Sequence, residues 1–461
     1  MVSTHLAEVQ RGSKYLPQVT NNGSTSPNQE LLPLTTKINN RDNLEIGGCD
    51  VTNLIEQFGS PLYILDEETV RSACRQYRES FATYYKGESQ VLYASKAWSC
   101  LAVCAIVQSE GLGIDVVSAG ELYTALNAGV SPDKIYLHGN NKSRDELIYA
   151  IESGITIVVD NWYELKTLVE LGDAQPLRIM LRLTPGIECH THEYIRTGHL
   201  DSKFGFDPNQ LDEVFAFVSQ QQTLNCVGVH AHIGSQIFEQ QPHQDLAALM
   251  VEWLVKAASH GLTVTELNVG GGLGIKYIES DDPPSIEEWV KPICEVIQSA
   301  CATANLPLPK LLSEPGRSII ANSCVTAYTI GSSKQIPQRN YIAIDGGMSD
   351  NPRPITYQSV YRAVIANKMS APCTETVTIA GKHCESGDIL IKNALMPKTQ
   401  PGDILVVLAT GAYNYSMSSN YNRLPRPAAV LVANGEANLI LQRETFQDLI
   451  RQDCLPERLK K

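Results

Sequence analysis

Residues 91–139 read VLYASKAWSCLAVCAIVQSEGLGIDVVSAGELYTALNAGVSPDKIYLHG, and this stretch decides the fold. Short apolar runs, typical of buried strands, alternate in it with longer segments whose apolar residues recur near a period of 3.6. The alternation continues to about residue 320 and predicts eight strands: VLYA (91–94), IDVV (114–117), KIYLH (134–138), ITIVV (155–159), RIMLRL (178–183), CVGVHAH (226–232), ELNV (266–269) and KLLS (310–313). Eight strands alternating with helices over about 250 residues predict a TIM-type (β/α)8 barrel, with a doubly wound open sheet as the alternative.

The segments outside this region have a different pattern. After about residue 321, strand-like runs such as YIAIDGG, ETVTIAG, DILVVLAT and AAVLVANG follow one another with few helical segments between them. We therefore predict an α/β barrel domain over residues 67–320 and a second, mostly β-sheet domain formed by residues 46–66 and 321–461. PLYILD (61–66) is expected to be one of its strands. Residues 1–45 are rich in Ser, Thr, Asn, Gln and Pro, and we predict a mobile tail.

Composition narrows the class of protein. Of the 461 residues, 43% are hydrophobic and 19% are charged, which is usual for globular domains and unlike a coiled coil or a disordered chain. The net charge of −13 argues against nucleic acid or an anionic membrane as a partner. The twelve cysteines form no CxxC pair, so we expect reduced thiols and a cytoplasmic location. The long, hydroxyl-rich N-terminal segment leaves a plastid location open, although Glu8 and Glu30 are unusual in a transit peptide.

Polar and glycine residues follow most of the predicted barrel strands. In a TIM-type barrel these positions share one rim, where the chemistry of this fold collects. The rim residues that we predict are Ser95, Lys96, Ser118, His138, Gly139, Asn140, Asn141, Arg182, His230, His232, Gly234, Ser235, Gly270, Gly271, Gly272, Leu273, Gly274, Glu314, Pro315, Gly316 and Arg317. Each one alone has an ordinary structural explanation, so their joint placement carries the prediction of a site.

Lys96 and the run GGGLG (270–274) together indicate pyridoxal phosphate. A partly desolvated lysine can form a Schiff base, and the loops after strands seven and eight of this fold commonly bind phosphate. Glu314 would then lie beside the pyridine nitrogen and keep it protonated, and His232 would lie flat on the ring. An isolated lysine is more often a solvated surface residue, and an isolated histidine is more often part of a core.

The pairs His190-Thr-His192 and His230-Ala-His232 suggest a metal site instead. Histidine pairs on strands bind zinc, and a metal-dependent barrel hydrolase would be the corresponding enzyme. No further acid completes the ligand set after strand eight, where Glu314 precedes PGR. We therefore disfavour the metal and predict none.

A series of motifs in order resembles a known family. They are YASKA, DVVSAGEL, HGNNKS, THEYIRTGH, DSKFGF, HAHIGSQI, NVGGGLGI, EPGRSI, DGGMSDNPRP, CESGD and GAYNYSMSSNYN. The series resembles the diaminopimelate decarboxylases, which are fold-type III pyridoxal-phosphate enzymes, and covers nearly the whole chain after the tail. Two positions depart from the family pattern: YASKAW stands where YAVKAN is usual, and Gly346 stands where a small residue such as Ala is expected.

The resemblance implies a role for each matching residue. Lys96 would bind the cofactor covalently, His232 would stack on its ring, and Glu314 would pair with its nitrogen. Ser235, Gly271, Gly272, Gly316 and Arg317 would hold the phosphate, and Tyr413 would close over the cofactor. Arg317, Arg353 and Tyr357 would bind substrate carboxylates. Cys384, as proton donor to the α-carbon, and Glu385, as partner of the distal ammonium, would come from the second subunit of a homodimer.

The activity implied is decarboxylation of meso-2,6-diaminopimelate to L-lysine and CO2. Arg353 would select this substrate, because ornithine, arginine and lysine lack the distal carboxylate. Three alternatives stay open: a decarboxylase of another basic amino acid, a racemase of the same fold, and a non-catalytic cofactor carrier. A racemase would place a tyrosine where this chain has Cys384, and a carrier would need only the barrel.

Overall fold

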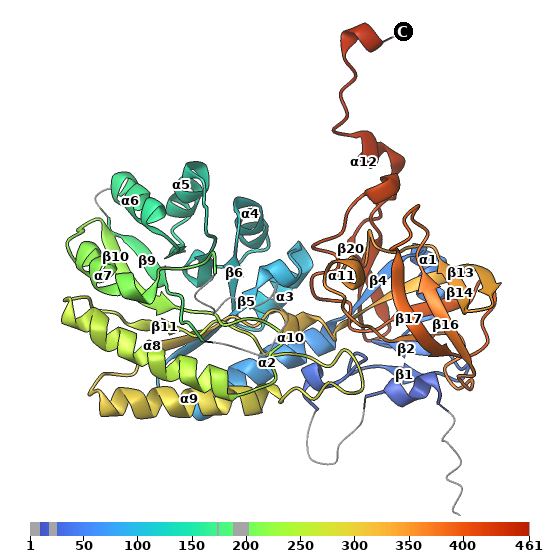
Figure 1. Cartoon of the computed structure of the whole chain (residues 1–461), viewed down its shortest axis with the longest axis horizontal. Helices are drawn as coiled ribbons and strands as arrows, with labels where there is room; N and C mark the ends of the chain where they lie inside the picture. Colours follow the sequence, from blue (N-terminus) through green and yellow to red (C-terminus); the bar gives the residue numbers. More distant parts are fainter. Residues whose placement is uncertain (1–9, 18–24, 173–174, 188–201, 461) are drawn as a thin grey trace, which may run out of the picture. The chain divides into compact units, whose positions relative to one another are not determined.

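The computed structural model describes residues 10–17, 25–172, 175–187 and 202–460, and these divide into two units. One unit contains Ser26–Gln29 and Val70–Ala321 and is called the barrel unit here. The other contains the described residues among 10–25, together with Glu30–Thr69 and residues 322–460, and is called the sheet unit. Each unit is described by itself (Figure 1).

The barrel unit is built on a closed sheet of eight parallel strands in the order β10-β11-β12-β5-β6-β7-β8-β9. This confirms the predicted (β/α)8 barrel, and all eight predicted runs are strands. Their bounds are β5 Ser89–Ala94, β6 Gly113–Val116, β7 Ile135–Leu137, β8 Thr156–Val159, β9 Leu177–Arg182, β10 Leu224–His230, β11 Glu266–Asn268 and β12 Lys310–Ser313.

Polar side chains cap the N-termini of four of the helices that follow the strands. Ser118 and Asn161 cap the helices after β6 and β8, and Ser143 and Ser285 form complete capping boxes with a glutamate three residues on. The helices are α2 Glu67–Tyr84, α3 Leu101–Ser109, α4 Ala119–Asn127, α5 Arg144–Glu152, α6 Trp162–Leu171, α7 Leu211–Ser219, α8 Gln241–Ser259, α9 Ile286–Thr303 and α10 Arg317–Ile320. Short 3-10 turns are η2 Pro27–Gln29, η3 Ser95–Ala97, η4 Pro132–Lys134 and η6 Pro208–Gln210.

The barrel interior is filled by large side chains from five of the strands: Leu92, Tyr136, Val158, Met180 and Leu312. Each is at most 1% exposed, and burying a side chain of this size stabilises the fold by about 1.5–3 kcal/mol. Because helices cover the outer face, the strands are apolar on both faces, which explains their continuous apolar runs. The packed interior leaves the carboxyl ends of the strands as the place for a site.

The sheet unit is organised by a nine-stranded sheet with the main order β17-β16-β14-β13-β4-β19-β20. Strand β18 also pairs with β13, and β15 pairs with β18. Strand β4 pairs with β13 and β19, which confirms that PLYILD is a strand of this domain. The bounds are β4 Leu62–Asp66, β13 Cys324–Ile336, β14 Arg339–Ile344, β15 Ala363–Ile365, β16 Glu375–Ala380, β17 Ile389–Met396, β18 Ile404–Val407, β19 Ala428–Ala433 and β20 Glu436–Leu441. Its helical segments are η1 Gly12–Tyr15, α1 Val51–Phe58, α11 Arg353–Thr356, η7 Tyr421–Arg423, α12 Phe446–Ile450 and η8 Glu457–Leu459.

Residues 25–45 depart from the predicted mobile tail, and that prediction was wrong for this part. Leu31, Leu32 and Leu44 are at most 5% exposed and belong to the core of the sheet unit. A small antiparallel sheet follows, formed by β1 Lys37–Ile38, β2 Leu44–Ile46 and β3 Cys49–Asp50. The polar composition was misleading because a few leucines, once buried, are enough to anchor a short segment. The predicted tail also covers residues 1–9 and 18–24, which lie outside the described residues.

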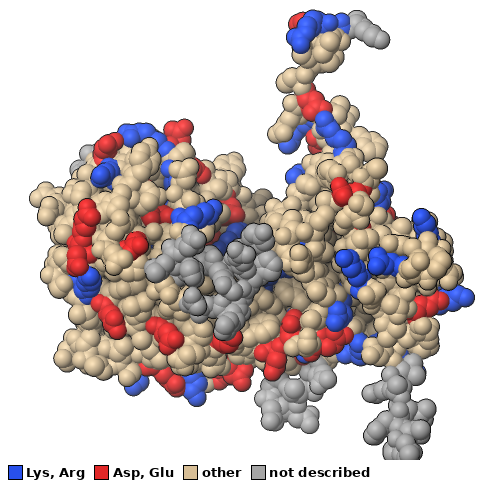
Figure 2. All heavy atoms as spheres, viewed as in Figure 1, with Lys and Arg blue, Asp and Glu red and all other residues tan. Residues whose placement is uncertain are grey.

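Acidic and basic side chains are interspersed over the face drawn in Figure 2, and the described residues there form no broad basic area. This distribution agrees with the net charge of −13. Within the described part of the chain, no helix has the length and apolar character needed to cross a bilayer.

Candidate active site

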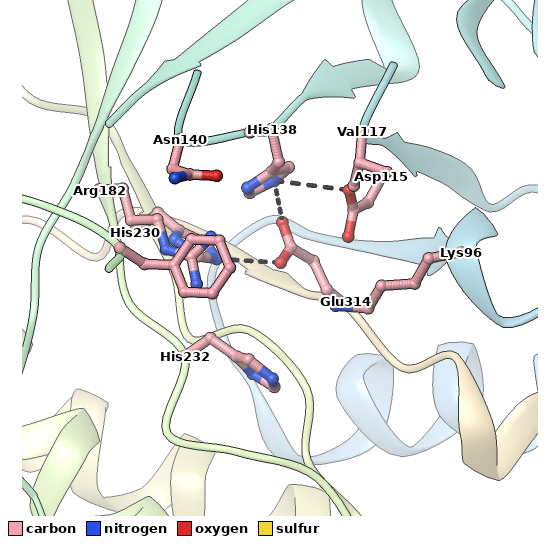
Figure 3. A pocket seen from close by; sticks show the side chains of 11 residues that line it. Lys96, Asp115, Val117, His138, Asn140, Arg182, His230, His232 and Glu314 are labelled. Atoms are coloured by element: carbon pink, nitrogen blue, oxygen red, sulfur yellow. Dashed lines mark hydrogen bonds and ion pairs between the residues drawn. The ribbon is translucent and has the colours of Figure 1, made fainter. Parts of the chain in front are cut away.

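A cavity of about 330 Å³ opens at the carboxyl ends of the barrel strands (Figure 3). This volume lies near the lower end of the range of small-molecule sites, roughly 300–1,000 Å³. The cavity is lined by Lys96, Asp115, Val117, His138, Gly139, Asn140, Arg182, Phe204, His230, His232 and Glu314. Three residues predicted for the cofactor, Lys96, His232 and Glu314, are thus brought together. Lys96 is exposed in the cavity although Ser95 and Ala97 beside it are buried, so its amine is accessible.

Glu314 is the most constrained side chain of the cavity. One carboxylate oxygen accepts a hydrogen bond from Asn268 Nδ2 at 2.6 Å and lies 2.8 Å from His138 Nε2, and the other lies 2.9 Å from His230 Nε2. Burial by itself raises the pKa of Glu314, but His138 and His230 together hold this pKa well below its ordinary value. Glu314 is therefore a buried carboxylate that keeps its negative charge.

His232 is held as a neutral ring. Burial lowers its pKa well below the ordinary value, and the nearby charges of Lys96 and Arg182 lower it further. The backbone N–H of Gly271 donates to His232 Nδ1 at 3.2 Å. This hydrogen bond requires Nδ1 to be the acceptor, so the proton of the neutral ring is on Nε2. One backbone contact thereby sets both the orientation and the tautomer of His232.

The residues predicted for the phosphate also lie together. A Cβ atom on Gly271 would approach Glu314 O to 2.3 Å, and one on Gly272 would approach Gly234 O to 3.0 Å. The three loops that carry Gly234, Gly271 and Gly316 therefore meet backbone to backbone, where only glycine fits. Arg317 is buried and donates to Ser235 Oγ through Nε at 3.1 Å and Nη2 at 3.0 Å, and to Tyr277 Oη through Nη1 at 2.7 Å.

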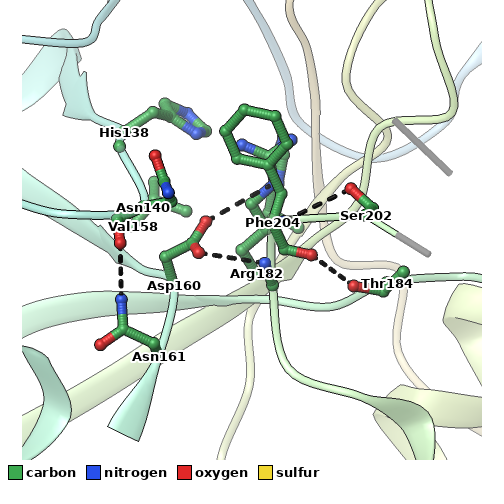
Figure 4. A network of polar contacts seen from close by, with 12 residues as sticks. His138, Asn140, Val158, Asp160, Asn161, Arg182, Thr184, Ser202 and Phe204 are labelled. Carbon is green, nitrogen blue, oxygen red and sulfur yellow. Dashed lines mark hydrogen bonds and ion pairs between the residues drawn. The ribbon is translucent and has the colours of Figure 1, made fainter. Parts of the chain in front are cut away.

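A second polar network supports the wall of the cavity (Figure 4). Asp160 accepts from the backbone N–H of Gly205 at 3.1 Å and lies 4.0 Å from Arg182 Nε. The Arg182 guanidinium lies over the Phe204 ring, 4.2 Å from its centroid. The backbone of Phe206 also pairs with the chain at the end of β9. Its N–H donates to Arg182 O at 2.9 Å, and its carbonyl accepts from the N–H of Thr184 at 3.0 Å. These contacts place Arg182 at the cavity, as expected for a rim residue.

The sheet unit brings together part of the predicted substrate set. Arg353 is buried, donates to Tyr361 Oη at 2.6 Å, and lies 5.9 Å from the centroid of the Tyr413 ring. Tyr413 is half-buried and has a φ of 70°, an unusual backbone conformation for a tyrosine that marks a strained position. Tyr357 follows at the end of α11, and its N–H donates to the Arg353 carbonyl at 2.9 Å.

Cys384 and Glu385 are exposed on a short loop between β16 and β17. The N–H of Cys384 donates to Asn422 Oδ1 at 2.8 Å, and Tyr421 Oη lies 3.5 Å from Glu385 Oε2. Most of the other described cysteines are buried, and burial raises the pKa of several of their thiols, for example that of Cys104 to about 12. Cys384 therefore differs from the structural cysteines in accessibility.

Comparisons with known proteins agree on one family. Residues 67–321 match the model of the pyridoxal-dependent decarboxylase, pyridoxal binding domain. The chain is 62% identical to the diaminopimelate decarboxylase of Synechocystis sp. over 470 residues, covering 100% of both chains. It is 44% identical to that of Bacillus subtilis, covering 91% of this chain and 97% of the relative. The chain belongs to the diaminopimelate decarboxylase family.

Solved structures of diaminopimelate decarboxylases have the same architecture. The M. jannaschii enzyme in complex with L-lysine matches with a TM-score of 0.87 and 32% identity, over 95% of this chain and 100% of that one. The Helicobacter pylori enzyme, also complexed with L-lysine, matches with a TM-score of 0.81 and 29% identity, over 87% and 98%. Membership of this family makes the chain a carboxy-lyase that depends on pyridoxal phosphate.

The residues of the barrel unit fit this cofactor. An accessible amine on Lys96, an ionised carboxylate on Glu314 and a neutral ring on His232 face one cavity. Glycine loops that tolerate no Cβ lie beside them and carry the Ser235–Arg317 pair. This donor set suits an aldehyde, a pyridine nitrogen and a phosphate.

The cluster His138, His230 and Glu314 also has the composition of a metal site, since its ligand atoms all lie within 4.8 Å of one another. The carboxylate lies at hydrogen-bond distance from Nε2 of both histidines and also accepts from Asn268. The other histidine pair considered from the sequence, His190 and His192, lies outside the described residues.

Two residues of the site have no clear signal in the sequence. Asp115 lies inside β6 rather than after it, and burial raises the pKa of this acid to about 6 against the attraction of His138. Asn268 ends the short strand β11 and donates to Glu314. A polar residue inside a predicted barrel strand is the signal that would have indicated both, because such a residue must have a partner in the interior.

Proposed function

We propose that this chain catalyses the pyridoxal-phosphate-dependent decarboxylation of meso-2,6-diaminopimelate to L-lysine and CO2, the last step of lysine biosynthesis. The observation that carries the proposal is the convergence of Lys96, His232 and Glu314 on one cavity of a barrel of this family. Relatives that cover the chain are diaminopimelate decarboxylases, and two solved relatives are complexes with L-lysine, the product expected here.

The barrel residues would hold and polarise the cofactor. Bound pyridoxal phosphate supplies an electron sink for the pair of electrons that CO2 leaves at the α-carbon. Lys96 is the amine that attaches the cofactor and yields its place to the substrate amine. Glu314, kept ionised by its neighbours, holds a proton on the pyridine nitrogen. His232 supports one ring face as a neutral group, and Ser235, Gly271, Gly272, Gly316 and Arg317 bind the phosphate.

The residues of the sheet unit would bind the substrate and complete the reaction. Arg353 and Tyr357 of this unit, together with Arg317 of the barrel unit, would bind substrate carboxylates, since a guanidinium pairs with a carboxylate through two parallel hydrogen bonds. Tyr413 closes over the cofactor. Cys384 donates a proton to the α-carbon after CO2 has left, and Glu385 pairs with the distal ammonium group. The exposure of Cys384 and Glu385 supports a role on a surface that another chain covers.

We further propose that the enzyme is a homodimer in which each active site receives Cys384 and Glu385 from the second subunit. We place it in the cytoplasm, which the free state of every described cysteine supports. Its partners in this proposal are the small-molecule substrate, the cofactor and a second copy of the chain.

Product analysis tests the proposed function. The enzyme is incubated with pyridoxal phosphate and meso-diaminopimelate, with ornithine, arginine and lysine in parallel reactions. Release of CO2 and L-lysine from the first substrate alone is expected. Decarboxylation of one of the other three would keep the cofactor site but overturn the assigned substrate. Epimerised diaminopimelate without CO2 would identify a racemase, and cofactor binding without any turnover would identify a carrier.

A further inference from the structure

Asn28 is wholly buried, although it lies in the polar N-terminal segment. Its side-chain amide donates two hydrogen bonds to the barrel unit, one to Gly274 O at 3.1 Å and one to Pro284 O at 2.8 Å. Its backbone carbonyl accepts from the N–H of Lys276 at 2.8 Å. A buried amide with this many partners is a specific connection, because each partner would be costly to leave unpaired.

The neighbours of Asn28 orient it. Ser26 Oγ donates to Asn28 Oδ1 at 2.7 Å and accepts from the N–H of Ile286 at 3.1 Å. Gln29 Nε2 donates to Pro283 O at 3.0 Å. Residues Ser26–Gln29, called the strap here, therefore belong to the barrel unit, while the chain on both sides of them belongs to the sheet unit. The strap also precedes residues 67–321, which match the family domain.

Gly274 and Lys276, which Asn28 contacts, follow directly after Gly271 and Gly272 in the glycine loop. The loop also forms hydrogen bonds with residues 236–237, which follow Ser235. Ile237 N–H donates to Gly272 O at 3.0 Å, Gly274 N–H donates to Ile237 O at 3.1 Å, and Gln236 Nε2 donates to Ile275 O at 2.7 Å. The loop with Gly271 and Gly272 is thus held from two sides, by residues 236–237 and by the strap.

We infer that Asn28 is a positioning residue for the cofactor phosphate, acting through the glycine loop. The inference rests on the proposed role of Gly271 and Gly272 as phosphate ligands. A run of glycines has a large backbone entropy, and fixing its conformation on binding lowers the affinity for the ligand. A strap that fixes Gly274 and Lys276 before the ligand arrives removes part of this cost from binding, which raises the affinity.

The test measures the dissociation constant of pyridoxal phosphate with the full-length apoenzyme, by titration of its absorbance. Asn28→Ala is compared with Gln29→Ala, a matched control that removes a strap hydrogen bond to Pro283 rather than to the glycine loop. We expect Asn28→Ala to raise the dissociation constant about tenfold, which corresponds to about 1.4 kcal/mol. Gln29→Ala is expected to change it less than about twofold, as suits a bond remote from the loop.

Hydrogen exchange of the peptide covering residues 270–276 gives a second readout. Faster exchange there in Asn28→Ala, and not in Gln29→Ala, is expected for a positioning role. If Asn28→Ala fails to fold, Ser26→Ala serves in its place, because it removes only the bond that orients the Asn28 amide and one bond to Ile286. An unchanged dissociation constant in the folded variant would overturn the inference.

Gly272→Ala separates this inference from the proposed function. If Gly272→Ala weakens cofactor binding and Asn28→Ala does not, the phosphate site stands and the role of the strap is wrong. If neither substitution changes binding, the glycine loop does not hold the phosphate and both assignments are wrong.

Discussion

At the scale of single residues, the site depends on a charge that is protected inside the barrel. Glu314 is 8% exposed, and a carboxylate in such a place would ordinarily become neutral. Asn268 Nδ2 donates to one carboxylate oxygen, and Nε2 of His138 and Nε2 of His230 each lie within 2.9 Å of the carboxylate, which stabilises its charge. The negative charge can then act on a cationic group in the cavity with little screening by water.

Glu314→Gln tests this charge. The amide keeps the size of the side chain but cannot hold a proton on a pyridine nitrogen. We expect kcat to fall by roughly 10²–10³, as for the loss of one electrostatic contact in an active site. The control is Glu266→Gln, a buried glutamate at the start of β11, which accepts from Tyr136 Oη at 3.0 Å. It should lose stability and keep its kcat, and equal losses of kcat in both variants would contradict the role of Glu314.

Arg353→Ala tests the choice of substrate. Arg353 is 7% exposed, and in the proposed site its loss removes a buried partner of the substrate carboxylate. We expect kcat/KM for diaminopimelate to fall on the order of 10³-fold, with little change in the cofactor dissociation constant. Arg339→Ala, at an exposed position in β14, is the control and should leave both quantities unchanged. An equal loss of substrate use and cofactor binding would show that Arg353 does not select the substrate.

At the scale of elements, the loop of Cys384 is organised by a buried contact between His383 and Asp388. His383 has a fully buried side chain whose Nδ1 lies 2.7 Å from Asp388 Oδ2. Asp388 also accepts from the N–H of His383 at 3.0 Å and from that of Met348 at 2.7 Å. The His383 ring stacks on Tyr421 with centroids 5.9 Å apart. An exposed cysteine is thus carried by a loop with a rigid base.

Asp388→Asn is expected to loosen this loop. The free energy of unfolding should fall by about 1–3 kcal/mol, because buried donors lose a charged acceptor. If Cys384 donates the proton, kcat should fall about tenfold or more, since small misplacements of reacting groups are costly. The Cys384 thiol should also react faster with an alkylating reagent. Asp453→Asn, in an exposed pair with Arg423, is the control and should change none of the three.

Helix α8 carries a buried histidine that makes stability depend on pH. Burial lowers the pKa of His243 to about 3, whereas an unfolded histidine titrates near 6.5. Between these values the unfolded chain binds more protons than the folded chain, so the free energy of unfolding falls as the pH falls. This stability is fully present above about pH 6.5, and His243 contributes a loss of about 1.4 kcal/mol per pH unit below it.

Urea unfolding of the wild type and of His243→Gln between pH 7 and pH 4 measures this contribution. The free energy of unfolding of the variant should fall less steeply as the pH falls. The difference in slope should be about 1.4 kcal/mol per pH unit, which corresponds to one proton. Parallel slopes for the wild type and His243→Gln would show that His243 does not resist protonation in the folded state.

At the scale of the whole molecule, the proposed active site needs residues from both domains and from two subunits. Co-expression of Lys96→Ala and Cys384→Ala chains tests this arrangement, because each variant lacks a different part of the site. Mixed dimers would contain one site with both residues intact, so about a quarter of the wild-type activity should return at equal mixing. Activity that stays at the level of the single variants would mean that Lys96 and Cys384 act within one chain.

Much of the fold could be predicted from local patterns. The eight barrel strands are mostly apolar runs that alternate with helical segments, so the pattern was recognisable from the sequence. The sequence analysis did not single out strand β13. Residues 331–335 in its second half are exposed and polar, so only the apolar first half has the character of a buried strand. The buried segment around Leu31 and Leu32 was missed because two leucines in a polar stretch give no periodicity.

The sequence by itself determined the barrel, the rim on which Lys96, His232 and Glu314 stand, and the family, because each follows from short segments in a known order. The tertiary structure alone decided the state of these groups. Glu314 is charged because Asn268, His138 and His230, from three other strands or strand ends, converge on it. Asn28 reaches Gly274 across 246 positions of sequence. Burial and hydrogen bonding depend on neighbours in space, and no local pattern contains them.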